Sequence, residues 1–362
     1  MQAANPYIYK IKPYIPGKPI DEVRRELGLK SVIKLASNEN PYPPSPKVLA
    51  AIGKAAREVN RYPDGGCFQL RRALARKLNV DDDQLIFGNG SDEIIVLAVK
   101  AFAAKGDEVI IAKPSFLVYE IASTLSGARL HQVPLKDFRY DLQTMKTKVN
   151  KRTKIIFIGN PDNPAGTYIT TAQAEDFLRS VPKSTLVFFD EAYFEFVHAK
   201  DYPDTISLMK KYPNVITART FSKIYGLAGL RVGYGVASRE IIGILDRLRE
   251  PFNVNSIAQA AAVAALADET YYRKIAKEIE GQKQYLYRSL ESIGVSYETS
   301  FTNFISVHVG GDSTKVAGAL LKKGVIIRDM AAWGLKGYIR VSIGSASENK
   351  RFIKTLKAVY LI

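Results

Sequence analysis

Residues 220–235 read TFSKIYGLAGLRVGYG and contain one lysine, Lys223, between two hydroxyl residues and an apolar, glycine-rich continuation. The residues before it, in NVITARTFSK (214–223), form the β-branched run that is typical of a buried strand. The chain has 52 Lys and Arg residues, and we expect most of them to be solvated. A lysine at the end of a buried strand either extends its amine to solvent or is retained for chemistry.

Similar apolar runs recur before this segment, with helical patterns between them. The runs indicate strands buried on both faces, at 84–91, 107–115, 153–161 and 185–193. One helix is predicted at 91–106, with Ser91 as N-cap and Gly106 as its end, and another at 170–181, with Thr170 as N-cap. The alternation predicts an α/β fold with a mainly parallel central sheet. In such sheets, ligands bind beyond the carboxyl ends of the strands.

The pattern changes near residue 250. A long polar helix at 268–294 and a shorter one near 313–323 accompany predicted strands at 303–309, 325–329 and 338–344. We therefore predict three parts: a proline-interrupted N-terminal arm (1–30), a large domain (31–250) and a smaller α+β domain (251–362).

Composition excludes several classes of function. The formal charge of +16 favours acidic or phosphorylated partners, but the basic residues are dispersed and no nucleic-acid-binding module is recognisable. One cysteine and three histidines at unrelated spacings argue against disulfides and a metal site. The N-terminus lacks the apolar core of a signal peptide, and no stretch is apolar enough to span a membrane. We expect a cytoplasmic protein.

Polar residues follow several predicted strands. Asp190 ends the strand in FFDEAY, and because a helix-length connection and one strand separate it from Lys223, both should lie at one edge of the sheet. Asn163 lies in NPDNPAG (160–166), whose two Asn-Pro steps favour a tight turn that can include a cis bond. Taken alone, Asp190 is equally compatible with a capping or turn role, and the Asn163 segment with a plain loop.

Anion-binding groups gather at the same predicted edge. GNGSDE (88–93) offers backbone amides at a helix N-terminus, although Glu93 interrupts the glycine pattern of a dinucleotide-binding loop. The Thr220 and Ser222 hydroxyls and the Arg231 guanidinium would complete a phosphate site. Arg231 is also compatible with an ordinary surface position.

In their order and spacing, NPDNPAG, DEAY and TFSKIYGLAGLRVGY resemble the fold-type I pyridoxal-phosphate (PLP) aminotransferases, over nearly the whole chain. Within that family, PYIPGKP (13–19), LASNENPYPPS (35–45), NRYPDGG (60–66), RDMAAWGL (328–335) and YIRVSIG (338–344) are similar to the histidinol-phosphate aminotransferases. Aromatic-amino-acid aminotransferases share many of these segments.

The resemblance implies a seven-stranded type of central sheet in a large PLP-binding domain. It also implies a role for each matched residue. Lys223 would bond covalently to the aldehyde of PLP, Asp190 would pair with the pyridine nitrogen, and Tyr193 and Asn163 would bind the phenolic oxygen. Phe116 would stack on the ring; the family usually has Tyr here, so only stacking carries over. The remaining implied contacts are to the phosphate, by Ser91, Asp92, Thr220, Ser222, Arg231 and, from the neighbouring subunit of a homodimer, Tyr62, and to substrate, by Arg328, Arg340, Tyr14 and Asn38.

The implied reaction is amino-group transfer between histidinol phosphate and 2-oxoglutarate in histidine biosynthesis, with Lys223, Asp190 and Tyr193 as catalytic residues. Alternatives within the cofactor class are an aromatic-amino-acid aminotransferase and a phosphothreonine decarboxylase. Outside it, a ligand sensor would need an additional DNA-binding module for which no residues remain, and a nicotinamide-dependent dehydrogenase would need the glycine pattern that Glu93 interrupts.

Overall fold

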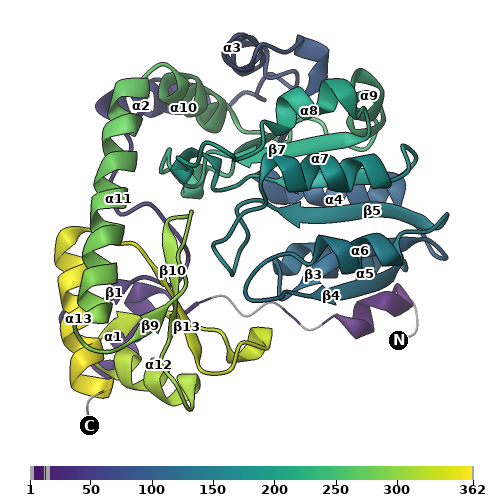
Figure 1. The fold of residues 1–362 in the computed structure, drawn as a ribbon. Coiled ribbons are helices and arrows are strands. Elements are labelled where there is room, and N and C mark those ends of the chain that lie inside the picture. Colours follow the sequence, from purple (N-terminus) through teal and green to yellow (C-terminus); the bar gives the residue numbers. More distant parts are fainter. Residues whose placement is uncertain (1–3, 12, 14–16, 361–362) are drawn as a thin grey trace.

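The computed structural model describes residues 4–11, 13 and 17–360, and its largest element is a central sheet (Figure 1). Within the described residues this sheet has seven strands in the order β2-β8-β7-β6-β5-β3-β4, all parallel except β8. The α/β prediction is confirmed. The strands are β2 (Leu85–Gly88), β3 (Glu108–Lys113), β4 (Arg129–Pro134), β5 (Thr153–Gly159), β6 (Leu186–Asp190), β7 (Val215–Thr220) and β8 (Gly233–Ala237).

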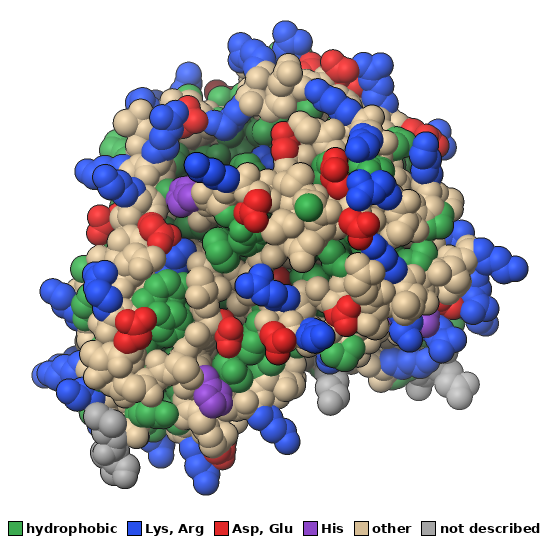
Figure 2. Space-filling model, viewed as in Figure 1, with side chains coloured by type: hydrophobic (Ala, Val, Ile, Leu, Met, Phe, Trp, Pro, Cys, Tyr) green, Lys and Arg blue, Asp and Glu red, His purple; other side chains and the backbone are tan. Residues whose placement is uncertain are grey.

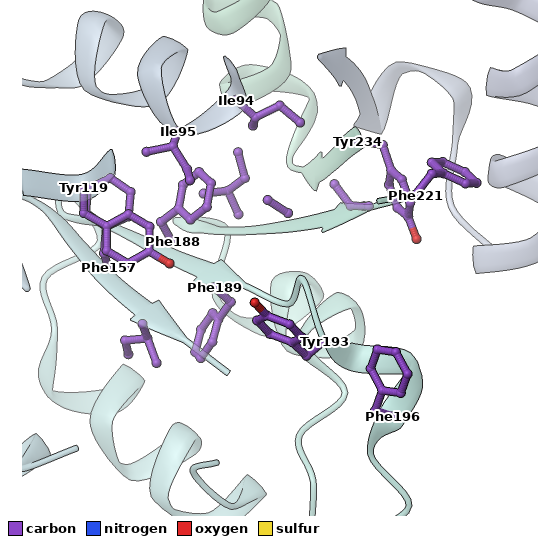
Figure 3. Packing of buried hydrophobic residues seen from close by; sticks show 14 of the residues in the cluster. Ile94, Ile95, Tyr119, Phe157, Phe188, Phe189, Tyr193, Phe196, Phe221 and Tyr234 are labelled. Atoms are coloured by element: carbon purple, nitrogen blue, oxygen red, sulfur yellow. The ribbon is translucent and has the colours of Figure 1, made fainter. Parts of the chain in front are cut away.

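The middle strands are buried on both faces, as their apolar runs predict. Phe157 of β5 and Phe188 and Phe189 of β6 have no exposed surface, and Figure 3 shows them packed with apolar residues of neighbouring elements. Helices cover both faces of the sheet; in Figure 1, α6 and α7 lie in front of it and α4 lies behind. These helices are α4 (Ser91–Phe102), α5 (Leu117–Ser126), α6 (Leu142–Lys148), α7 (Thr171–Ser180), α8 (Thr205–Lys211) and α9 (Arg239–Asp246).

Two predicted helix ends differ from the structure. The N-cap of α4 is Gly90 at φ 81°, so Ser91 is the first helical residue, and the helix ends at Phe102 because Ala103 is extended. By contrast, Thr170 does cap α7, in a capping box with Gln173. Gly90 was not anticipated because a turn that requires a positive φ is visible only once the chain path is known.

The C-terminal part contains a four-stranded antiparallel sheet in the order β12-β13-β10-β9. Its elements are α10 (Ser256–Leu266), α11 (Glu269–Glu291), β9 (Ser296–Tyr297), β10 (Phe304–His308), α12 (Ser313–Lys322), β11 (Val325–Ile326), β12 (Arg328–Asp329), β13 (Tyr338–Ser342) and α13 (Ala346–Tyr360). This agrees with the helices and strands predicted there. The exact domain limits remain a prediction.

N-terminal residues join both parts of the molecule. β1 (Ile33–Lys34) pairs in parallel with β11, and Val23 of α1 (Ile20–Leu27) packs with Val32, Ala36 and Ile326. The helices α2 (Pro46–Ala55) and α3 (Phe68–Leu78) contact α10. Short 3-10 helices occupy Pro6–Lys10, Ala56–Glu58, Asp82–Gln84, Phe194–Phe196, Ala228–Leu230 and Ala331–Trp333.

The surface agrees with the dispersed charge of the sequence. In Figure 2, Lys and Arg side chains are scattered over the visible face, with Asp and Glu between them. Among the helices of residues 4–11, 13 and 17–360, none has the length and apolarity needed to cross a bilayer.

Candidate active site

A cavity of about 490 Å³ lies between the carboxyl ends of the central strands and the C-terminal sheet. It brings together side chains from segments that are far apart in the sequence. All but two of the predicted site residues line it: Asn38, Ser91, Asp92, Phe116, Asn163, Asp190, Tyr193, Thr220, Ser222, Lys223, Arg231, Arg328 and Arg340.

The two exceptions are Tyr62 and Tyr14. Tyr62 is 84% exposed and its ring stacks on Phe252 at a centroid distance of 4.9 Å, outside this cavity. Its predicted role concerns a neighbouring subunit and stays a prediction. Tyr14 lies outside the described residues.

Lys223 and Asp190 face the same cavity from adjacent strands, as predicted from their spacing. Asp190 is the last residue of β6, and Lys223 follows the end of β7 in a turn. Burial, with the nearby Arg340 guanidinium, lowers the pKa of the Lys223 amine to about 8. About a tenth of this amine is therefore uncharged at pH 7, and that form can act as a nucleophile or proton acceptor.

The Asp190 carboxylate is buried, with 6% of the residue exposed. Burial raises its pKa to about 6, against the effect of a hydrogen bond from the Tyr119 hydroxyl, whose oxygen lies 2.7 Å from Oδ2. The second oxygen, Oδ1, accepts from the Ala192 amide at 3.1 Å. Sequence reasoning missed Tyr119, although it lies one helical turn after Phe116 and that spacing was the available signal.

A set of hydrogen-bond donors surrounds the start of α4. The Thr220 hydroxyl lies 3.0 Å from that of Ser222, and Arg231 contacts Ser222 at 3.4 Å and Asp92 at 3.2 Å. A Cβ on Gly233 would lie 2.5 Å from the Ser91 amide nitrogen, so only glycine allows β8 to approach the helix N-terminus this closely. Hydroxyls, amides and a guanidinium together suit a phosphate dianion.

Tyr193 and Asn163 extend the site toward the C-terminal sheet. The Asn38 amide donates to the Tyr193 hydroxyl at 2.9 Å, and Arg340 donates to Asn163 Oδ1 at 2.5 Å. Asn38 was predicted to bind substrate. Its contact with Tyr193, a predicted cofactor-binding residue, was not part of that prediction. The first contact links Asn38 to the turn after β6, and the second links β13 to the loop after β5.

Arg340 is 4% exposed and its second guanidinium nitrogen donates to the Ala36 carbonyl at 3.1 Å. Its Cζ lies 5.3 Å from the ring centre of Trp333, which also lines the cavity and was not among the predicted site residues. Arg328 lines the same wall. Two guanidinium groups at one side of a cavity can bind a phosphate or a carboxylate.

A buried ion pair supports the ends of β6 and β7 from behind. The Glu191 carboxylate contacts Arg219 at 2.8 Å and accepts from the Thr205 hydroxyl at 2.7 Å. Glu191 directly follows Asp190, and Arg219 directly precedes Thr220. Because each strand alternates its side chains, one residue of each pair faces the cavity while its neighbour joins this second layer.

The chemistry of the cavity matches PLP, the group that the resemblance implies. Donors for a phosphate, a carboxylate for a protonated ring nitrogen, hydroxyl and amide groups for a phenolic oxygen, and an amine with a lowered pKa are all present. A metal centre has no comparable support: over the described part of the chain, no three His, Cys, Asp or Glu side chains are grouped to hold one.

Comparisons with known proteins agree with this geometry. The model of the family "Aminotransferase class I and II" matches residues 30–356. A histidinol-phosphate aminotransferase of Moorella thermoacetica is 49% identical over 354 residues, covering 97% of this chain and 92% of that protein. Histidinol-phosphate aminotransferase 2 of Carboxydothermus hydrogenoformans is 48% identical, covering 96% and 97%.

Solved structures give the same result for the fold. The histidinol-phosphate aminotransferase of Sinorhizobium meliloti in complex with PLP superposes with a TM-score of 0.92 at 30% identity, covering 100% of this chain and 98% of that one. Aspartate aminotransferase of Thermus thermophilus with maleate has a TM-score of 0.86, covering 99% and 100%; at 19% identity it supports the fold alone.

Proposed function

The chain belongs to the class I and II aminotransferases, and on that premise we propose that it transfers the amino group of histidinol phosphate to 2-oxoglutarate with PLP as cofactor. The observation that carries the proposal is the shared cavity, in which Lys223 and Asp190 face Arg328 and Arg340. The names of relatives at 48–49% identity favour histidinol phosphate over the alternative donors.

Each residue would hold one part of the cofactor. Lys223 would hold its aldehyde, Asp190 its ring nitrogen, Tyr193 and Asn163 its phenolic oxygen, and Phe116 its ring face. The groups for the phosphate would be Ser91, Asp92, Thr220, Ser222 and Arg231. When bound, PLP supplies an electron sink for the bond that breaks at the substrate α-carbon.

The protein's own groups would perform the proton transfers. With its pKa lowered to about 8, the Lys223 amine can accept the α-proton of the amino donor. In the second half of the reaction it can donate a proton to the α-carbon of the acceptor substrate. The Asp190 carboxylate, when ionised, stabilises positive charge at its end of the site. Arg328 and Arg340 would bind the phosphate of one substrate and the carboxylate of the other in turn.

We also propose that the protein acts in the cytoplasm as a homodimer in which Tyr62 reaches the phosphate site of the neighbouring subunit. Support comes from the exposure of Tyr62 and of apolar neighbours in sequence such as Val59 and Phe68, at 61% and 58%. Sedimentation analysis tests the dimer, and the Tyr62→Phe variant tests the contact through the dissociation constant of PLP. A monomer at working concentrations would contradict both.

Substrate choice is tested by comparing kcat/KM for histidinol phosphate, phenylalanine and phosphothreonine, each with 2-oxoglutarate as acceptor. We expect histidinol phosphate to be at least tenfold better than phenylalanine, since only it offers a phosphate dianion to the arginines. Faster turnover of phenylalanine would favour the aromatic-amino-acid alternative. Release of CO₂ from phosphothreonine would favour the decarboxylase.

A further inference from the structure

Tyr119 is a buried tyrosine at the junction of two parts of the proposed site. It is 2% exposed, and its ring stacks on that of Phe157, with 4.6 Å between the ring centroids and 5° between the ring planes (Figure 3). This packing fixes the ring, so the hydroxyl has one direction available. In that direction lies Asp190 Oδ2, at 2.7 Å.

The same ring also contacts Phe116. Phe116 is the N-cap residue of α5, and its ring meets that of Tyr119 edge-on, at 5.6 Å and 84°. Phe116 lines the cavity and has no hydroxyl of its own. Tyr119 therefore contacts both Phe116, which is expected to stack on the cofactor ring, and Asp190, which is expected to pair with the ring nitrogen.

From these contacts we infer that Tyr119 is a positioning residue for PLP: its hydroxyl keeps Asp190 ionised and directed into the cavity, and its ring supports Phe116. The inference rests on the proposed function. Asp190 Oδ2 has the Tyr119 hydroxyl as its side-chain donor, and Asp190 is buried, with 6% of the residue exposed. A carboxylate stripped of a donor in such surroundings takes up a proton more readily.

Other titratable groups also lie around Asp190, and they influence the pH dependence of PLP binding. Asp92 on α4 disfavours the charged carboxylate and Lys223 favours it. Asp190 in turn interacts with three further titratable groups, Tyr140, Asp162 and Tyr193. All five remain in a variant that removes only the Tyr119 hydroxyl, so the change isolates one donor.

The test is the binding of PLP, measured by equilibrium dialysis from pH 5.5 to 8.5 for the wild-type protein and Tyr119→Phe. We expect PLP to bind about 10- to 100-fold more weakly to Tyr119→Phe at neutral pH, the range for a hydrogen bond to a charged group. The midpoint of the acid loss of binding should move upward by on the order of one pH unit. Unchanged binding, or equal weakening at every pH, would overturn the inference.

Tyr140→Phe is the matched control. Tyr140 is also buried and also donates to a carboxylate, Asp162, at 3.1 Å, so the same atom is removed at a second site. Because Tyr140 interacts with Asp190 but does not donate a hydrogen bond to it, Tyr140→Phe should move the midpoint much less than Tyr119→Phe does. In an Asp190→Asn background, Tyr119→Phe should have less than a threefold effect on binding, because the carboxylate charge that the Tyr119 hydroxyl stabilises is gone. A full effect there would overturn the inference.

If Tyr119→Phe does not fold, Tyr119→His replaces it, since an imidazole N–H can still donate. A wild-type midpoint in that variant supports the inference and a shifted midpoint opposes it. Because dialysis needs no substrate, failure of the wild-type protein to bind PLP would count against the proposed function, and equal binding by both proteins against the role of Tyr119.

Discussion

The two walls of the cavity are built differently. On the sheet side, Asp190 and Thr220 end adjacent parallel strands, and hydrogen bonds between β6 and β7 fix their spacing. On the opposite side, Arg340 is held by contacts to Ala36 and Asn163, residues far away in the sequence. The groups proposed to make and break bonds thus lie at the ends of sheet strands, whereas the groups proposed to bind substrate are held by contacts between distant segments.

The largest effect is expected on the sheet side, at Lys223. Lys223→Ala should lower kcat more than about 10⁴-fold, since it removes both the nucleophile and the proton carrier, and should abolish the absorption band of lysine-bound cofactor. Lys283→Ala is the control, because Lys283 is also buried but pairs with Glu280 on α11, outside the cavity. Turnover by Lys223→Ala within tenfold of wild type would refute its role.

The next comparison is between neighbours on β6. Glu191→Gln should destabilise the protein by about 3 kcal/mol, because it leaves the buried Arg219 charge without its partner. Asp190→Asn should instead lower kcat about 10²- to 10³-fold with a smaller loss of stability. Urea denaturation and steady-state kinetics on both variants separate the two effects. If both variants lost stability equally, the division into a cavity-facing and a supporting layer would be wrong.

A smaller effect is expected on the substrate side. Arg340→Lys should raise KM for histidinol phosphate about 10- to 100-fold and change kcat little, because a single ammonium cannot keep the contacts to Asn163 and Ala36 and also bind substrate. Arg351→Lys serves as control, since Arg351 contacts Ser31 away from the cavity. A fall in kcat with unchanged KM would assign Arg340 to the sheet-side chemistry instead.

The smallest effect concerns the loop between the two walls. Asp162, in the loop that carries Asn163, is buried, and burial raises its pKa from 3.8 to about 7. As the pH rises from 6 to 8, the folded protein therefore loses a proton there that the unfolded chain has already lost at lower pH. This group should lower the free energy of unfolding by about 1.4 kcal/mol as the pH rises from 6 to 8.

Urea denaturation of the protein without PLP, at several pH values, measures that slope. Asp162→Asn should remove the part of the pH dependence that comes from Asp162, because an amide does not titrate. The contributions of other buried carboxylates should remain. An identical pH dependence in wild type and Asp162→Asn would contradict the raised pKa. A steeper pH dependence in Asp162→Asn would mean that the pKa of Asp162 is lowered by folding, the opposite of the prediction.

Several predictions succeeded because they depended on local pattern. The strands that end at Asp190 and Thr220 are recognisable from continuous β-branched and aromatic runs, and parallel topology then fixes the edge at which both residues lie. The resemblance identified many of the residues that line the cavity, including Arg328 and Arg340, and their roles remain predictions. By contrast, Tyr119 and Trp333 were missed, because an aromatic residue on a helix or loop is usually a core residue.

The amino-acid sequence by itself determined which groups the protein can use, the strands that carry Lys223 and Asp190, and the class of chemistry. Only the tertiary structure decided which oxygen of Asp190 meets Tyr119, how Asn38 reaches Tyr193, and that Arg340 is joined to Asn163 and Ala36. The physical reason is range. Strand pattern and capping act over a few residues, whereas these contacts join segments whose approach depends on packing of the whole chain.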